Sequence, residues 1–151
     1  MHIKENSPVN FQVLGELFAR EEDLLSIWKD AQYPLNIGQW LTRFQANGSE
    51  HYKSYLLKIG KEIIGHSALK IESKDLLHIE LFFIRPEFRT KKNMTEVVAK
   101  FESYVKKRFS QTEISFEICA KEVALIEWLT SSGYVIYHEN DQIVRLKRLI
   151  H

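Results

Sequence analysis

The sequence predicts an α/β fold with a mixed, mostly antiparallel central sheet flanked by helices. Three observations predict it: two helical segments come first, three strand-like runs follow, and helices and strands then alternate to the C-terminus. The chain has 151 residues, of which 44% are hydrophobic and 27% charged, without repeats or Pro/Gly-rich linkers. We therefore expect residues 1–151 to form a single domain with a sizeable core.

Two helices are expected in the first third of the chain. Ser7 and Pro8 are typical of a helix start, with Ser7 as the cap and Pro8 at the first helical position. For the second helix, Asn36 followed by Gln39 predicts a capping box. Asn47-Gly48 predicts its end, because these residues tolerate a left-handed conformation.

Strand signals dominate the middle of the chain. Two short apolar runs on either side of Gly60-Lys61 predict a hairpin. The segment "DLLHIELFFIRP" is nearly continuously apolar, which predicts a strand covered on both faces and ended by Pro86. Further on, "EISFEIC" alternates like a strand, and "YVIYH" with "QIVRLKRLI" predicts a last hairpin.

Two more helices are predicted between these strands. Apolar residues recur at helical spacing from Thr95 onwards, at Val97, Val98, Phe101, Val105 and Phe109. Asn93 followed by Glu96 predicts a capping box that satisfies the first backbone N–H groups of this helix. The segment "KEVALIEWLTSSG" predicts a short helix closed by Gly133.

Composition excludes several classes of protein. The net charge of +1 and the lack of a recognition motif give no basis for a nucleic-acid partner. A single cysteine, Cys119, excludes an internal disulfide, and the histidines lack a ligand spacing, so no metal is expected. The N-terminus has no apolar signal segment and the apolar runs are too short to span a bilayer. We therefore expect a cytoplasmic protein with no membrane partner.

Three segments, "FFIRPEFRTKKNM", "ALIEWLTSSGY" and "YLLKIGKEIIGHSAL", and the element order resemble the GNAT superfamily of N-acetyltransferases, over most of the chain from about Ser7 to Ile150. The first segment resembles that family's strand, Pro turn and arginine-led pyrophosphate loop. The second is similar to its helix that ends in Gly-aromatic, and the third to its second hairpin. The resemblance implies the acyl-CoA N-acyltransferase (GNAT) fold, with acetyl-CoA as cofactor and a primary amine of a small molecule or protein as acceptor. A homodimer is a further expectation.

The cofactor loop departs from the family pattern, which is Gln or Arg, two variable residues, Gly, one variable residue, then Gly or Ala. Aligned on Arg89, the sequence puts Lys92 and Met94 where small residues belong, so both are expected to add bulk there. Backbone N–H groups at a helix start can nevertheless hold a pyrophosphate without glycine, and nearby basic side chains add charge. The resemblance implies cofactor contacts at Phe82, Phe83, Ile84, Arg89, Thr90, Lys91, Lys92, Asn93, Met94 and Thr95.

Catalytic candidates lie on the strand before the loop. His78 and Glu80 are two residues apart and therefore share one face of that strand. A carboxylate in an apolar run is costly unless it is paired or has a raised pKa, and both are common at functional sites. The resemblance implies that Glu80 or His78 takes the proton of the amine. Pairing of Glu80 with a neighbouring lysine or with His78 is the alternative.

The general acid is harder to place. The family often has a tyrosine four residues before the glycine that ends the last helix, but Leu129 occupies that position here. Tyr134 is the expected substitute, with Tyr137 close by. A core or hairpin role for these tyrosines stays open.

Two classes of function remain open at this stage. One is an acetyl-CoA-dependent N-acetyltransferase, favoured by the retained Arg89 and the basic loop. The other is a non-catalytic binding module of the same fold, favoured by the glycine-free loop and the missing tyrosine. Aromatic residues Trp28, Tyr33 and Trp40 near the acidic stretch "REED" would suit a cationic amine acceptor.

Overall fold

The computed structural model describes residues 1–48 and 50–150. Within them a seven-stranded sheet has the order β1-β2-β3-β4-β5-β7-β6, and every neighbouring pair is antiparallel except β4 with β5. The strands are β1 (His2–Glu5), β2 (Tyr52–Ile59), β3 (Glu62–Ile71), β4 (Leu76–Ile84), β5 (Glu113–Cys119), β6 (Val135–Glu139) and β7 (Ile143–Leu149). This sheet confirms the predicted fold class.

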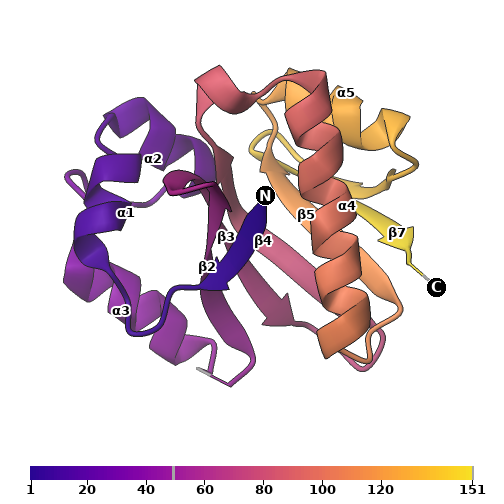
Figure 1. Cartoon of the computed structure of the whole chain (residues 1–151), viewed down its shortest axis with the longest axis horizontal. Coiled ribbons are helices and arrows are strands. Elements are labelled where there is room, and N and C mark those ends of the chain that lie inside the picture. Colours follow the sequence, from indigo (N-terminus) through magenta and orange to yellow (C-terminus); the bar gives the residue numbers. More distant parts are fainter. Residues whose placement is uncertain (49, 151) are drawn as a thin grey trace.

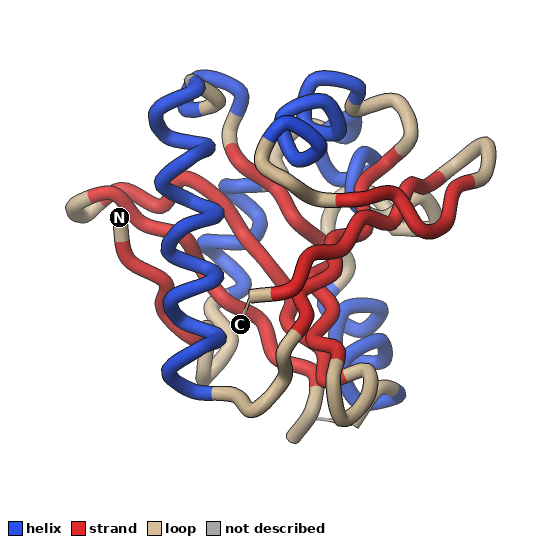
Figure 2. Tube along the Cα trace, turned by 90° about the vertical axis from the view of Figure 1, so that its right-hand side faces the viewer, coloured by secondary structure: helices blue, strands red, loops and turns tan. Residues whose placement is uncertain are grey.

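The helices cover the two faces of the sheet (Figure 1). They are α1 (Phe11–Leu17), α2 (Glu21–Ile27), α3 (Ile37–Ala46), the short 3₁₀ helix η1 (Pro86–Phe88), α4 (Lys91–Arg108) and α5 (Val123–Ser131). A core beneath α1–α3 contains Leu14, Trp40 and Phe83, whereas a larger core beneath α4 and α5 contains Phe101 and Phe116. Figure 2 shows α4 lying along the sheet. Among the described residues, none of the helices combines the length and apolar character needed to cross a membrane.

The start of the chain differs from the prediction. Strand β1 was not predicted, because its four residues carry no clear alternation, yet it pairs with β2 along the sheet edge. The predicted helix from Ser7 corresponds to α1 alone, and α2 (Glu21–Ile27) is an additional helix that was not predicted. Asn10 caps the first one by accepting a hydrogen bond from the Val13 N–H at 3.1 Å, so Ser7 and Pro8 lie outside it.

Most other boundaries follow the local signals. Asn36 accepts from the Gln39 N–H at 2.8 Å, as predicted, but the Gln39 side chain bonds to Gln32 and Asp30 instead of reaching back, so half of the capping box is confirmed. Gly48 and Gly133, which follow α3 and α5, have φ values of 81° and 95°, and Gly60 in the β2–β3 turn has 59°. These values confirm that the chain is left-handed at the two predicted helix ends and at the predicted hairpin turn.

The start of α4 is a correction. Thr90, not Asn93, caps the helix: its side chain accepts from the Asn93 N–H at 3.2 Å and its carbonyl from the Met94 N–H at 2.9 Å. The Asn93 side chain donates to the Phe88 carbonyl, and Glu96 pairs with the amine of Met1. The predicted Asn93–Glu96 capping box is therefore wrong.

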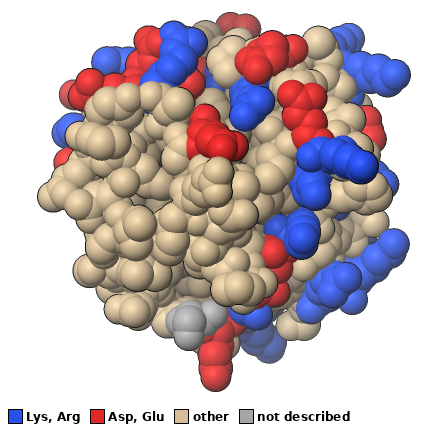
Figure 3. Space-filling model, turned by 60° about the vertical axis from the view of Figure 1, so that its left-hand side comes forward, with Lys and Arg blue, Asp and Glu red and all other residues tan. Residues whose placement is uncertain are grey.

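Charges are unevenly distributed over the surface. Figure 3 shows a broad face with few charged side chains on the side of α1–α3. Between Ala31 and Gly48, Arg43 is the one Lys, Arg, Asp or Glu residue, and it points inwards to Glu80. The one charged side chain of α3 therefore pairs inside the molecule instead of facing solvent.

Candidate functional site

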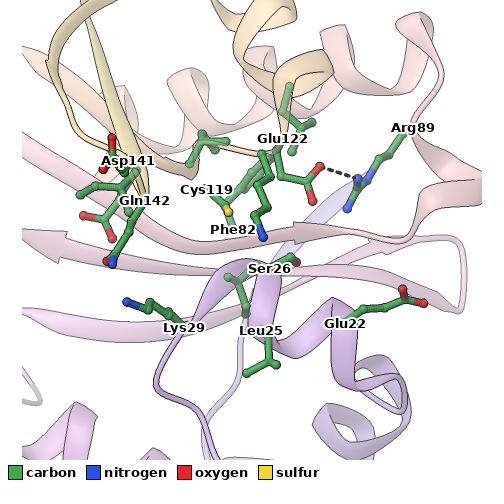
Figure 4. A pocket seen from close by; sticks show the side chains of 16 residues that line it. Glu22, Leu25, Ser26, Lys29, Phe82, Arg89, Cys119, Glu122, Asp141 and Gln142 are labelled. Carbon is green, nitrogen blue, oxygen red and sulfur yellow. Dashed lines mark hydrogen bonds and ion pairs between the residues drawn. The ribbon is translucent and has the colours of Figure 1, made fainter.

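A cavity of about 570 Å³ opens where β4 and β5 part (Figure 4). The two strands pair from Leu76 and Glu113 as far as Ile79 and Phe116, and their facing edges have no mutual pairs beyond that point. Phe82, Glu117 and Cys119 line the cavity, together with α2, the start of α5 and the loop before β7. The parting strands thus leave backbone groups free to meet a ligand.

A bulge in β4 shapes the wall of this cavity. The β3–β4 register pairs Ala68 with Glu80 but His66 with Phe83, so β4 has one extra residue here. Leu81 has φ 49° and is the one non-glycine residue with positive φ in the described chain. The bulge lets Glu80 and Leu81 both face the α1–α3 side, while Phe82 joins the core beneath α4.

Glu80 is fixed by two donors. Its Oε1 accepts from the Tyr52 hydroxyl and from Arg43 Nη2 at 3.1 Å, and Arg43 Nε donates to the Tyr52 hydroxyl at 2.9 Å. The guanidinium lies 4.8 Å from the centre of the Trp28 ring. Burial alone would raise the pKa of Glu80, but the Tyr52 bond and the Arg43 charge outweigh it and lower that pKa. The carboxylate therefore stays ionised at neutral pH.

His78 lies beside this carboxylate with one ring nitrogen engaged. Its Nδ1 is 3.0 Å from the Ser115 Oγ, which is 2.7 Å from the Tyr137 hydroxyl. Its buried Nε2 has no hydrogen-bond partner among the described residues, and lies 3.6 Å from Glu80 Oε2 and 4.0 Å from Glu117 Oε1. Burial lowers the pKa of His78 despite the two carboxylates. The imidazole is therefore uncharged at neutral pH.

His78, Glu80 and Glu117 bring ligand atoms within 4.8 Å of one another, a spacing that a cation could bridge. Arg43 already pairs with Glu80, and Arg145 donates to Glu117 Oε1 at 3.0 Å. A divalent cation would have to compete with both guanidinium groups, so we assign no metal to this cluster.

The cofactor loop carries an ion pair at the mouth of the cavity. Arg89 Nε donates to the Ile84 carbonyl at 2.7 Å, and its Nη1 donates to Glu122 Oε2 at 3.2 Å, the contact drawn in Figure 4. Thr90 satisfies the N–H groups of Asn93 and Met94, which leaves those of Lys91 and Lys92 without a partner among the described residues. The side chains of Thr90, Lys91, Lys92 and Thr95 are exposed.

Met94 does not obstruct this helix start. Its side chain is 4% exposed and packs in the core with Val97, Val98 and Phe101. Because α4 begins at Lys91, Met94 falls on the inner face of the helix. The expectation that Met94 adds bulk at the loop is therefore wrong, whereas the Lys92 side chain does face solvent.

The structure does not bring Tyr134 to His78 and Glu80. Tyr134 packs against Phe116 in the core beneath α4, and its hydroxyl donates to Glu102 at 3.1 Å. Tyr137 lies on the other side, joined to His78 through Ser115. A bulge between Ile136 and His138 in β6 leaves Tyr137 outside the register pairs.

The partners of Glu80 were missed at the level of sequence. Neither a lysine nor His78 alone satisfies it; Arg43 and Tyr52 do, from 37 and 28 residues away. The one available signal was the cost of leaving a carboxylate unpaired in an apolar strand. Buried His66 was missed as well, because nothing local distinguishes it.

A comparison with protein-family models matches residues 16–134 to the Acetyltransferase (GNAT) family. The chain belongs to the GNAT acetyltransferase family. As a member it is an acetyl-CoA-dependent N-acetyltransferase with an amine acceptor. A comparison with curated protein sequences finds no match.

Solved structures of this fold align over nearly the whole chain. A spermidine N-acetyltransferase from Vibrio cholerae, in complex with CoA and spermine, has TM-score 0.75 and 12% identity over 98% of this chain and 94% of its own. An acetyl transferase from Salmonella typhimurium, which modifies the N-terminal serine of a 50S ribosomal subunit protein, has TM-score 0.74 and 13% identity over 99% and 94%. At such identities the likeness supports the fold.

Proposed function

We propose that the protein transfers an acetyl group from acetyl-CoA directly to a primary amine of a small molecule or a protein. The observation that carries the proposal is the position of the cavity. It lies at the parting of β4 and β5, with Arg89 in its wall at one end and Glu117, next to His78, in its wall at another. The cavity thus runs from Arg89 of the cofactor loop to Glu117, the neighbour of His78, although His78 and Glu80 do not themselves line it.

The cofactor half of the site fits a pyrophosphate. The free N–H groups of Lys91 and Lys92 and the guanidinium of Arg89 supply donors and positive charge, while Thr90, Asn93, Met94 and Thr95 build the helix start. The edge of β4 at Phe82, Phe83 and Ile84 has no pairs with β5 and would meet the pantetheine arm, although the Ile84 carbonyl already accepts from Arg89. Acetyl-CoA supplies an activated thioester when bound. These residues hold and orient it.

The proton half of the site combines one base with two fixed charges. His78 is uncharged and its Nε2 is free, so it is the group we assign to accept the proton of the attacking amine. Glu80 and Glu117 lie within 4.0 Å of that nitrogen and would stabilise the imidazolium that forms. Because the pKa of Glu80 is lowered, this carboxylate is a weak base and serves better as the stabilising charge. Tyr134 has no role in this scheme.

The acceptor side combines carboxylates with apolar surface. Glu22, Glu117 and Asp141 line the cavity together with Leu25 and Ile143, and Lys29 and Lys121 line it as well. Such walls suit an amine on an apolar stem. The cytoplasmic location and the homodimer remain predictions.

Calorimetric titration with acetyl-CoA tests the proposal first, with CoA and a simple adenine nucleotide as controls. We expect saturable binding that requires the CoA moiety, followed by CoA release in a panel of primary amines. Arg89→Ala should weaken the binding of acetyl-CoA about tenfold, which corresponds to the loss of one charge-assisted hydrogen bond. Glu80→Gln should lower turnover more than affinity.

The second candidate is the non-catalytic module, and one contact favours it. Glu122 already occupies Arg89 inside the cavity, where a phosphate would need that guanidinium. Absence of acetyl-CoA binding at millimolar concentration, which corresponds to about −4 kcal/mol, would make this module the better description.

A further inference from the structure

His66 on β3 is a buried histidine with both ring nitrogens engaged. Its side chain is 0% exposed and packs against Trp40 and Phe18. Nδ1 lies 2.9 Å from the carbonyl oxygen of Leu81, and Nε2 lies 2.7 Å from the Oγ of Ser54 on β2. His66, Leu81 and Ser54 belong neither to the cofactor loop nor to the cluster around His78.

The partners define the tautomer of this imidazole. A carbonyl oxygen can only accept, so Nδ1 carries the proton and donates it to Leu81. Nε2 then accepts from the Ser54 hydroxyl. Burial lowers the pKa of His66 to about 4, so the ring stays uncharged at neutral pH. His66 is therefore a fixed donor to one backbone carbonyl.

That carbonyl belongs to the peptide at the centre of the β4 bulge. Neither Leu81 nor Phe82 takes part in a register pair with β3, so strand pairing does not hold this peptide in place. The bond between them is not among the cis peptides of the described chain, and in a trans peptide the C=O and N–H point in opposite directions. Because His66 holds the oxygen of this peptide, the Phe82 N–H points away from His66 and from β3.

The neighbouring residue of β3, Gly65, allows close strand approach on the other side of Phe82. A Cβ atom on Gly65 would lie 2.2 Å from the Phe83 carbonyl oxygen, so only glycine lets β3 approach β4 this closely. His66 thus holds the Leu81 carbonyl, and the lack of a side chain at Gly65 leaves room for the Phe83 carbonyl. Phe82 is also the β4 residue that lines the cavity.

We propose that His66 is a positioning residue for acetyl transfer: by holding the Leu81 carbonyl, it fixes the Phe82 N–H as the donor to the thioester carbonyl oxygen of acetyl-CoA. This inference rests on the proposed function. The N–H would strengthen its bond as negative charge develops on that oxygen during attack by the amine. Ser54 supports the role by holding the far side of the ring.

The test compares two ligands that differ by the acetyl group. Calorimetry measures Kd for acetyl-CoA and for CoA in wild type, His66→Leu and His66→Asn. A hydrogen bond to the acetyl carbonyl should make wild type prefer acetyl-CoA by about fivefold. His66→Leu should abolish the preference. His66→Asn should keep it, because the amide nitrogen of Asn can take the place of Nδ1.

Ser67→Ala is the matched control, since Ser67 is a buried serine on the same strand whose Oγ has no partner among the described residues. It should leave both Kd values unchanged, and thermal melting should show that every variant is folded.

The remaining outcomes overturn the inference in distinct ways. Equal weakening of acetyl-CoA and CoA in His66→Leu would mean a structural role alone. A preserved preference in His66→Leu would exclude His66 as the positioning residue, and equal affinity in wild type would exclude the acetyl contact. Both outcomes leave the proposed function standing. Failure of wild type to bind either ligand would overturn the proposed function and this inference together.

Discussion

Two Arg–Glu pairs differ in how firmly each is held, and only the second of them, Arg89 with Glu122, lines the cavity. Arg43 lies 3.1 Å from Glu80, and Arg89 lies 3.2 Å from Glu122. The two distances are nearly equal. Tyr52 bonds to both members of the first pair, whereas Glu122 accepts from Arg89 alone among the described residues.

The difference separates a structural charge from an exchangeable one. The side chain of Glu80 is 12% exposed and that of Glu122 is 27% exposed, so breaking the first pair leaves an unpaired charge that water reaches poorly. The second pair can change partners at little cost, because solvent screens both groups. A ligand phosphate could therefore displace Glu122 from Arg89, while no ligand would displace Glu80 from Arg43.

The largest effect is expected when the firmly held pair, Arg43 with Glu80, is broken. Arg43→Ala leaves Glu80 buried without its counter-charge, and should lower the free energy of unfolding by about 4 kcal/mol. Denaturant unfolding measures it, with Glu122→Ala as the matched variant of the loose pair, for which we expect less than about 1 kcal/mol. Similar losses in the two variants would contradict the comparison.

The next effect concerns the cofactor end. Met94→Ala removes a buried side chain from the core beneath α4 and should cost about 3 kcal/mol of stability. CoA affinity should not change, because that side chain faces away from the helix start. Lys92→Ala, at an exposed neighbouring position, should cost less than about 0.5 kcal/mol. Tighter CoA binding by Met94→Ala would show that methionine does obstruct the loop.

A smaller effect is expected from the exchangeable pair, Arg89 with Glu122. Glu122→Gln frees Arg89 and removes a negative charge from the cavity, so CoA should bind about fivefold more tightly, a gain of about 1 kcal/mol. Titration calorimetry measures it, with Glu87→Gln on the exposed surface of η1 as control. Weaker binding in Glu122→Gln would mean that Glu122 supports the cofactor site instead of competing in it.

The smallest effect is a pH dependence at the firm pair. The pKa of Glu80 is lowered from 4.5 in the folded protein, so the unfolded chain binds this proton at higher pH. The free energy of unfolding should therefore fall as pH drops below about 4.5, and Glu80→Gln should lack this part of the fall. The contribution of His66 to the free energy of unfolding also falls with decreasing pH, over an overlapping range. The measurement is therefore the difference between the wild-type and Glu80→Gln curves. Parallel curves would contradict the assignment.

Local signals in the sequence predicted much of the fold because they depend on neighbouring residues. Asn36 needs only the next turn of helix to act as a cap, and Gly48 and Gly60 adopt the positive φ that the local backbone requires. The apolar run of β4 likewise required a strand covered on both faces. Errors arose where two local signals competed, as at Thr90 and Asn93, or where a strand formed only against its partner, as at β1.

Long-range pairing decided the site. The sequence by itself determined a carboxylate two residues from a histidine in an apolar strand, and an arginine at the start of the loop. The tertiary structure alone decided that Arg43 and Tyr52 hold Glu80, that Tyr134 and Tyr137 face opposite sides, and that His66 holds the Leu81 carbonyl. One extra residue in a strand moves the following side chains to the other face, and pairing with the neighbouring strand sets where that residue falls.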